Sequence, residues 1–155
     1  MKKVLYLLFA ATVFISCGNS TNKKSATTAQ ADTKTETEAN VAINPDRIEV
    51  LYFHGAQRCI TCRAIEKHTK ELLDSLYSGE LGNGAIIYKA IDISQKENES
   101  IADKYEVTWS SLFVNKWDNG NEQVNNMTDY AFSYAKGQPE TFKAGLTEKI
   151  EELKK

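Results

Sequence analysis

The sequence has few of the residues that build metal centres, and it lacks the signature of a nucleotide-binding site. Among its 155 residues are three cysteines and two histidines. A structural zinc site needs four nitrogen or sulfur ligands, and the chain offers no convincing fourth. No glycine-rich nucleotide fingerprint is present, which argues against a flavin-bearing reductase. The formal net charge of −2 gives no indication of nucleic acid or of an anionic membrane patch as a partner.

The N-terminal residues differ in character from the rest of the chain. Residues 1–16 begin with two lysines, continue with about a dozen apolar residues and end in serine, the pattern of a secretory signal peptide. Residues 14–17, Phe-Ile-Ser-Cys, resemble the lipobox of bacterial lipoproteins. That resemblance implies cleavage before Cys17, lipidation of its thiol, and an exported protein held on a bacterial membrane facing the periplasm.

A polar segment follows Cys17. Residues 18–46 contain no aromatic residue and are rich in Thr, Ala, Ser, Lys and Glu, a composition that cannot bury enough apolar area to fold. We therefore expect residues 17–46 to be a lipidated flexible tether and residues 47–155 to form a single domain.

Hydrophobic periodicity within residues 47–155 predicts alternating strands and helices. Apolar runs or alternation predict strands at 48–53, 85–93, 109–117 and 122–127. Apolar residues at three-and-four spacing predict a helix from Cys59, ended by Gly79, Gly82 and Gly84, and further helices at 94–104, from Thr128 and from Pro139. The order is β-α-β-α-β-β-α, which predicts an α/β domain with a central mixed sheet flanked by helices.

A Cys-x-x-Cys pair, Cys59 and Cys62, lies between the first strand and the first helix. With that element order, the chain resembles the thioredoxin fold over residues 47–155. Thioredoxins carry a proline before the third core strand, and Ser110 or Ser111 occupies that place here. They also carry a buried acid on the first strand, where this chain has Phe53.

The residues around the cysteine pair resemble a smaller group within the thioredoxin-like proteins. The string FHGAQRCITCRAIE, residues 53–66, is similar to a group of small exported thioredoxin-like proteins known as the nitrophenyl-compound nitroreductase subunit, or ArsF, family. The family name implies a partner in reductive chemistry.

The spacing of the cysteines favours thiol–disulfide exchange on protein disulfides or dithiols. A thiolate is the attacking species, and the N-terminus of a helix stabilises an anion. Cys59 would stand at that position, flanked by Arg58 and Arg63, and Cys62 would resolve the mixed disulfide. On this interpretation the Cys59–Cys62 disulfide is the redox group, no further cofactor is needed, and the chain is an enzyme acting with a partner protein.

Three alternatives remain open at this stage. Cys59, Cys62 and His54 suit copper or zinc, which would make the protein a soft-metal chaperone. His54 could instead serve as a proton shuttle or a hydrogen-bonding scaffold. The chain could also be a non-catalytic accessory subunit of a reductase complex. A purely structural Cys59–Cys62 disulfide is disfavoured, because closing so short a loop removes little conformational entropy from the unfolded chain.

Overall fold

The structure is a computed structural model that describes residues 44–155. The expected signal peptide (1–16), Cys17 and all but the last three residues of the expected tether lie outside the described residues. No helix in the described part of the chain is long and apolar enough to cross a membrane.

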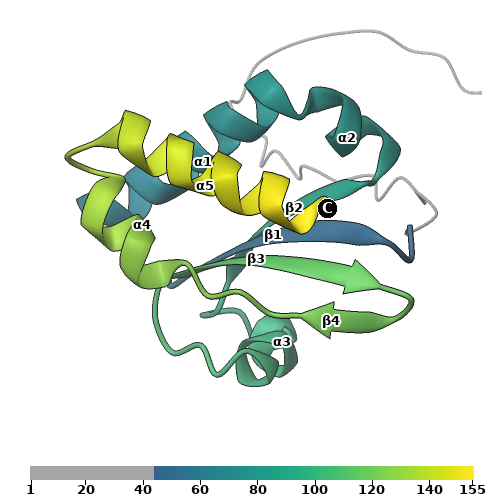
Figure 1. Cartoon of the computed structure of the whole chain (residues 1–155). Helices are drawn as coiled ribbons and strands as arrows, with labels where there is room; N and C mark the ends of the chain where they lie inside the picture. The colour runs from purple at the N-terminus through teal and green to yellow at the C-terminus, as the bar shows by residue number, and fades with distance from the viewer. Residues whose placement is uncertain (1–43) are drawn as a thin grey trace, which may run out of the picture. The chain divides into compact units, whose positions relative to one another are not determined.

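A four-stranded mixed sheet forms the centre of the domain, in the order β2-β1-β3-β4 (Figure 1). β1 (Arg47–His54) pairs in parallel with β2 (Ile86–Asp92) and antiparallel with β3 (Ser111–Asp118). β4 (Asn121–Gln123) adds an antiparallel edge. The expected α/β class, with a central mixed sheet flanked by helices, is confirmed.

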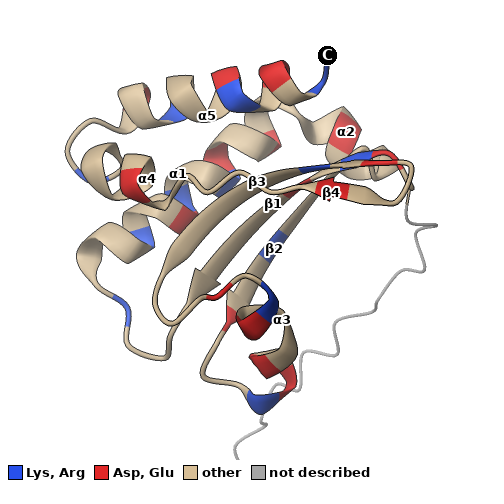
Figure 2. Ribbon diagram, turned by 60° about the horizontal axis from the view of Figure 1, so that its bottom comes forward, with Lys and Arg blue, Asp and Glu red and all other residues tan. Residues whose placement is uncertain are grey.

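Helices cover both faces of this sheet (Figure 1). α1 (Ile60–Leu76), α4 (Thr128–Tyr134) and α5 (Pro139–Leu153) lie over one face, and α3 (Glu99–Lys104) lies on the other. Basic and acidic residues alternate along α5, whereas the central strands are mainly uncharged (Figure 2).

The central position of β1 follows from its apolar residues on both faces. Ile48, Val50 and Tyr52 belong to the core under α1 and α5. Leu51 and Phe53 point the other way and pack with Tyr105 and Phe113 in a second core on the α3 side. A strand buried on both faces loses the polar–apolar alternation of a surface strand. The mostly apolar sequence of residues 48–53 is therefore a direct consequence of two cores.

The last two predicted strands form a hairpin of β3 and β4, and its turn is made by Asn119 and Gly120. Both residues have positive φ, 51° and 82°. Two-residue hairpin loops of this kind favour Asn-Gly because both central residues must adopt left-handed backbone. The second strand is shorter than the expected 122–127, since β4 ends at Gln123. The Asn115 side-chain oxygen accepts from the backbone N–H of Asn125 at 3.1 Å, which interrupts the ladder.

Two helical predictions differ from the structure. The glycines after α1 do not end the helical segment, because a short helix α2 (Ser78–Asn83) follows before Gly84 adopts φ 76°. The helix expected from Ser94 begins later, as a 3₁₀ turn η1 (Lys96–Asn98) leading into α3. Ser94 caps neither, because its hydroxyl donates to the Asp92 carboxylate at 2.6 Å.

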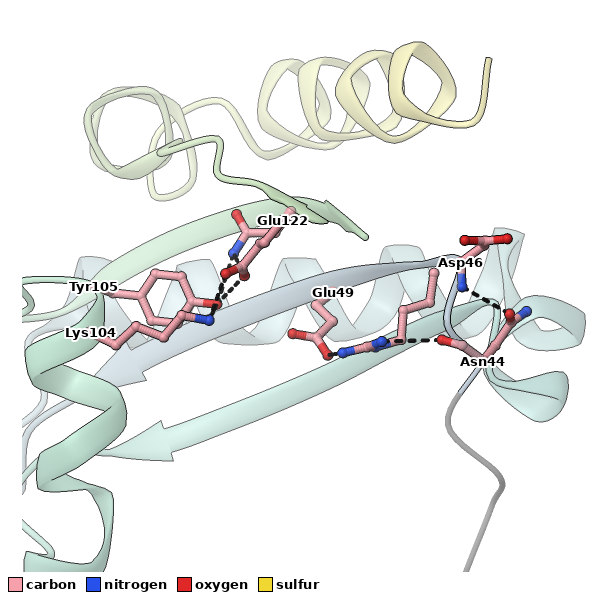
Figure 3. Close-up of polar contacts among 8 residues, drawn as sticks. Asn44, Asp46, Glu49, Lys104, Tyr105 and Glu122 are labelled. Atoms are coloured by element: carbon pink, nitrogen blue, oxygen red, sulfur yellow. Dashed lines mark hydrogen bonds and ion pairs between the residues drawn. The ribbon is translucent and has the colours of Figure 1, made fainter. Parts of the chain in front are cut away.

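A polar cluster of Lys104, Tyr105, Asn115 and Glu122 lies on the α3 side of the sheet (Figure 3). The Glu122 carboxylate accepts from the Tyr105 hydroxyl and, at 3.0 Å, from the Asn115 amide. The Lys104 ammonium lies 2.6 Å from the other carboxylate oxygen. Burial acts to raise the pKa of Glu122, but the contacts with Lys104 and Tyr105 outweigh it and hold the pKa below its usual value.

Candidate active site

The two cysteines lie where the chain passes from β1 into α1. They form a disulfide, with their Cα atoms 5.0 Å apart. Cys59 is exposed and is the N-cap of α1, whereas Cys62 lies one turn into the helix and is only 6% exposed. The structure therefore puts one sulfur-bearing residue at the surface and the other beneath it, with Cys59 at the helix start as expected.

The first turn of α1 directs backbone N–H groups toward Cys59. The Cys62 N–H lies 2.9 Å from Cys59 Sγ and donates to it. Cys59 has an extended backbone, φ −69° and ψ 165°, which is the usual conformation of an N-cap. The first N–H groups of a helix have no partner within the helix and carry its positive dipole end. In the reduced protein they would stabilise a Cys59 thiolate and so lower the pKa of its thiol.

Tyr52 attaches the second cysteine to the sheet. Its hydroxyl donates to the Cys62 backbone oxygen at 2.7 Å in a buried position. This carbonyl in the first turn of α1 is thus also fixed to the central strand. This contact was not predicted, although the alternation of β1 places Tyr52 on the α1 face together with Ile48 and Val50.

Arg58 precedes Cys59, but its guanidinium extends along α1 as far as Glu66. It pairs with the Glu66 carboxylate and lies over the Tyr52 ring, 5.5 Å from the ring centroid. Burial acts to lower the pKa of Arg58, but contacts with Tyr52 and Glu66 outweigh it and raise the pKa. Because Glu66 carries the opposite charge, it offsets much of the potential that Arg58 would supply to Cys59. Arg63 is exposed on the first turn of α1.

His54 is the last residue of β1 and is not grouped with other metal ligands in the described part of the chain. Its Nδ1 lies 3.1 Å from the Gly55 oxygen, and its ring centroid is 5.8 Å from that of Tyr52. Among residues 44–155, no group of three or more His, Cys, Asp or Glu side chains is arranged to hold a metal ion. His54 and the two cysteines therefore do not form a three-ligand set in this conformation. His68 lies farther along α1 and contacts Glu71, with 3.0 Å between Nδ1 and the carboxylate.

A cleft of about 410 Å³ opens beside the disulfide. Its lining residues include both cysteines and, from later in the chain, Trp109, Ser110 and Phe132. Trp109 is 58% exposed and stacks on Phe132, with 5.3 Å between the ring centroids. Ser110 is thus next to the cysteine pair, in the stretch where the sequence has no proline.

The loop that carries Trp109 and Ser110 is positioned by the end of α3. Glu106 has φ 54°, and the Val107 N–H donates to the Ala102 oxygen at 2.9 Å. This six-to-one hydrogen bond after a left-handed residue is a Schellman motif, usually made with glycine. Val107 is buried in the α3-side core, so the loop leaves the helix in a fixed direction.

Sequence reasoning missed Tyr52, Glu66 and Phe132 as residues of the site. Glu66 is four residues after Cys62, so the helical period alone places it on the same side of α1. Phe132 has no such signal, because its contact with Trp109 joins segments that are distant in the chain.

Comparisons with known proteins leave the chain without an assigned family. No protein-family model matches it, and no curated protein matches it. Among solved structures, one described as "Structure of a malarial protein" is similar at 19% identity and a TM-score of 0.37, covering 53% of this chain and 82% of that one.

Proposed function

We propose that the domain is a thiol–disulfide oxidoreductase that acts on protein disulfides or dithiols through Cys59 and Cys62. One observation carries the proposal. Of two cysteines joined at the N-terminus of α1, the first is exposed and accepts a backbone hydrogen bond on its sulfur, while the second is buried. An accessible sulfur that is electrostatically stabilised as an anion is the requirement for attack, and a shielded neighbour is suited to resolution.

The exchange balances without any further reagent. In the reduced protein the Cys59 thiolate attacks one sulfur of a substrate disulfide, whose S–S bond breaks and releases one substrate thiolate. Cys62 then loses its proton and attacks Cys59 Sγ, which breaks the mixed disulfide and releases the second substrate thiolate. Two electrons pass from the dithiol to the substrate, and the Cys59–Cys62 disulfide remains. The reverse sequence oxidises a substrate dithiol.

We further propose that the fold is thioredoxin-like and that the chain is related to the nitrophenyl-compound nitroreductase subunit family. The parallel β1–β2 pair, the intervening α1 and the antiparallel β3–β4 hairpin support the first statement. The sequence around the cysteine pair supports the second. On this view Ser110 borders the cysteines where thioredoxins have a proline.

The proposed site of action is a bacterial membrane surface facing the periplasm. Support comes from the sequence of residues 1–17, which suits export followed by lipidation of Cys17. The electron donor or acceptor would be a partner protein. Mass spectrometry of the mature N-terminus should find a lipid-modified Cys17, and an unmodified cysteine there would contradict the anchor.

A redox titration of the full-length protein tests the main proposal. Thiol labelling across a series of glutathione or dithiothreitol buffers should show one two-electron transition of Cys59 and Cys62, and Cu(I) should not be needed for it. A matched titration with Cu(I) separates the soft-metal alternative. Stoichiometric Cu(I) binding, with a disulfide that no protein substrate can oxidise or reduce, would contradict the oxidoreductase. Unaltered partner activity in a Cys59→Ser protein would instead indicate an accessory subunit.

A further inference from the structure

The cleft beside the disulfide has a distinctive chemical character. All of its lining residues are uncharged, although charged residues make up 26% of the chain. Its volume of about 410 Å³ is within the range of roughly 300–1,000 Å³ that is usual for ligand pockets. A cleft without charges offers nothing to pair with a charged substrate side chain, and it would desolvate such a group at a cost.

Two exposed apolar side chains are near Cys59, one in the cleft and one next to it in the chain. Trp109, stacked on Phe132, lines the cleft together with Cys59. Ile60 is 71% exposed and is the residue directly after Cys59. The only other large apolar side chains exposed in residues 44–155 are Leu76 and Val124, neither of which lines the cleft. Half of the exposed large apolar residues of the described chain are therefore next to the reactive sulfur or in its cleft.

The Trp109 ring is accessible although a more buried position would be more favourable for an indole. Large apolar side chains gain free energy on burial, so an exposed indole stacked on a half-buried phenylalanine beside the disulfide is typical of a contact surface. The Schellman motif at Glu106 and Val107 and the stacking on Phe132 hold the ring in place before any substrate arrives. A preformed surface of this kind loses less conformational entropy on binding.

We infer that the Trp109–Phe132 pair is a specificity surface, and that it selects polypeptide substrates with an aromatic or large aliphatic residue beside the reacting cysteine. The inference rests on the proposed function, since the surface acts only on a substrate that reacts with Cys59. Trp109 contacts the substrate flank rather than the sulfur, so it governs selectivity between substrates. Small charged disulfides gain nothing from this surface.

A competition experiment tests the inference. Two peptides of the same length carry Phe-Cys-Phe or Ser-Cys-Ser, each with its cysteine in a mixed disulfide with 2-mercaptoethanol. Reduced full-length protein, freed of reductant, receives both at equal concentration, and acid quenching with mass spectrometry gives the ratio of their rate constants. The same ratio measured with dithiothreitol corrects for the intrinsic reactivity of the peptides.

The corrected ratio should favour the phenylalanine peptide by about tenfold in the unaltered protein. Trp109→Ala should lower it by roughly twofold to tenfold, the range that one aromatic contact provides. Trp109→Phe should retain most of the preference, because the ring can still stack on Phe132. Leu76→Ala is the matched control, since Leu76 is 59% exposed but lies at the far end of α1 from the cysteines. The rise per residue of an α-helix puts it about 24 Å from the first residue of α1.

The outcomes separate the two proposals. Equal rates for the two peptides in the unaltered protein, or an unchanged ratio in Trp109→Ala, would overturn the specificity surface and leave the oxidoreductase intact. A loss of preference in Leu76→Ala would show that the effect is not local to the cleft, and would overturn it equally. If neither peptide reacts, the oxidoreductase itself fails, and the specificity surface fails with it.

Discussion

The Glu122 carboxylate in the polar cluster and the Cys59 sulfur beside the cleft differ in how many contacts each makes within the protein. In the cluster, the Glu122 carboxylate is bound by Lys104, Tyr105 and Asn115, so its hydrogen-bonding capacity is used within the protein. At the cleft, Cys59 is exposed, and apart from the disulfide to Cys62 its sulfur has one hydrogen bond, from the Cys62 backbone N–H. A group whose partners are all internal stabilises the fold, whereas a group left open to solvent can react. Under the proposed function, the cysteines carry out the reaction and the cluster contributes to the stability of the fold.

Removal of Cys59 should have the largest effect on chemistry. Cys59→Ser should slow reduction of a peptide disulfide on the order of a thousandfold or more, because it removes the attacking sulfur. Stopped-flow or quenched assays with a model disulfide measure this rate. The companion variant, Cys62→Ser, should still attack and should accumulate a mixed disulfide detectable by mass spectrometry. Rapid turnover by either variant would contradict the assigned roles.

Removal of Glu122 should have the largest effect on stability. Glu122→Ala leaves the Asn115 amide and the Tyr105 hydroxyl without their acceptor, which should lower the free energy of unfolding by about 2–3 kcal/mol. Urea titration measures the change, and the rate of disulfide exchange should stay the same. Glu148→Ala, at an exposed carboxylate on α5, is the control. If Glu122→Ala changes the rate of disulfide exchange under conditions where the variant is fully folded, the polar cluster and the cysteine pair are not independent.

The cluster should also give the protein a defined acid sensitivity. The pKa of Glu122 is lower in the folded protein than its ordinary value of 4.5, so its stabilising contribution is fully present above that pH. The contribution is then lost as the pH falls through the lowered value, because protonation cancels the attraction to Lys104. Urea midpoints measured between pH 7 and pH 3 should fall less steeply for Glu122→Gln than for the unaltered protein. Identical slopes would contradict this assignment.

Glu66, which pairs with Arg58 near the cysteines, provides a test with a smaller expected effect. Glu66→Gln removes the partner of Arg58 and should free its charge to stabilise a Cys59 thiolate. Labelling of Cys59 by iodoacetamide at pH 6 should become about twofold to fivefold faster, as expected for one partly screened charge. Glu71→Gln, at an exposed α1 carboxylate farther from the cysteines, should leave the rate unchanged. Slower labelling in Glu66→Gln would show that Glu66 acts in the opposite sense.

Much of the fold follows from local sequence. The apolar runs of β1 and β2, the three-and-four spacing of α1 and α5, and the Asn119-Gly120 turn each specify an element through its own period or backbone requirement. The errors arise where side chains compete for backbone groups. Asp92 engages Ser94 and delays the next helix, and Asn115 engages Asn125 and shortens β4.

Only those residues of the candidate site that are close together in the sequence could be predicted from it. Cys59, Cys62 and the start of α1 lie within one short segment, so spacing alone places them. The stacking of Trp109 on Phe132 and the hydrogen bond from Tyr52 to Cys62 join separate elements, and no local pattern encodes them. The pairing of Arg58 with Glu66 likewise needed the structure. Of the expected sources of electrostatic stabilisation, it weakens the contribution of Arg58 and leaves that of the helix N-terminus.

The pH dependence of Cys59 alkylation in the reduced full-length protein tests the account most directly. We expect Cys59 to react as a thiolate with an apparent pKa below the ordinary cysteine value of about 8.5, and well before the shielded Cys62 at every pH. Mass spectrometry of partially labelled protein distinguishes the two residues. A Cys59 that titrates at or above the ordinary value, or a Cys62 that is labelled equally fast, would contradict the proposed oxidoreductase.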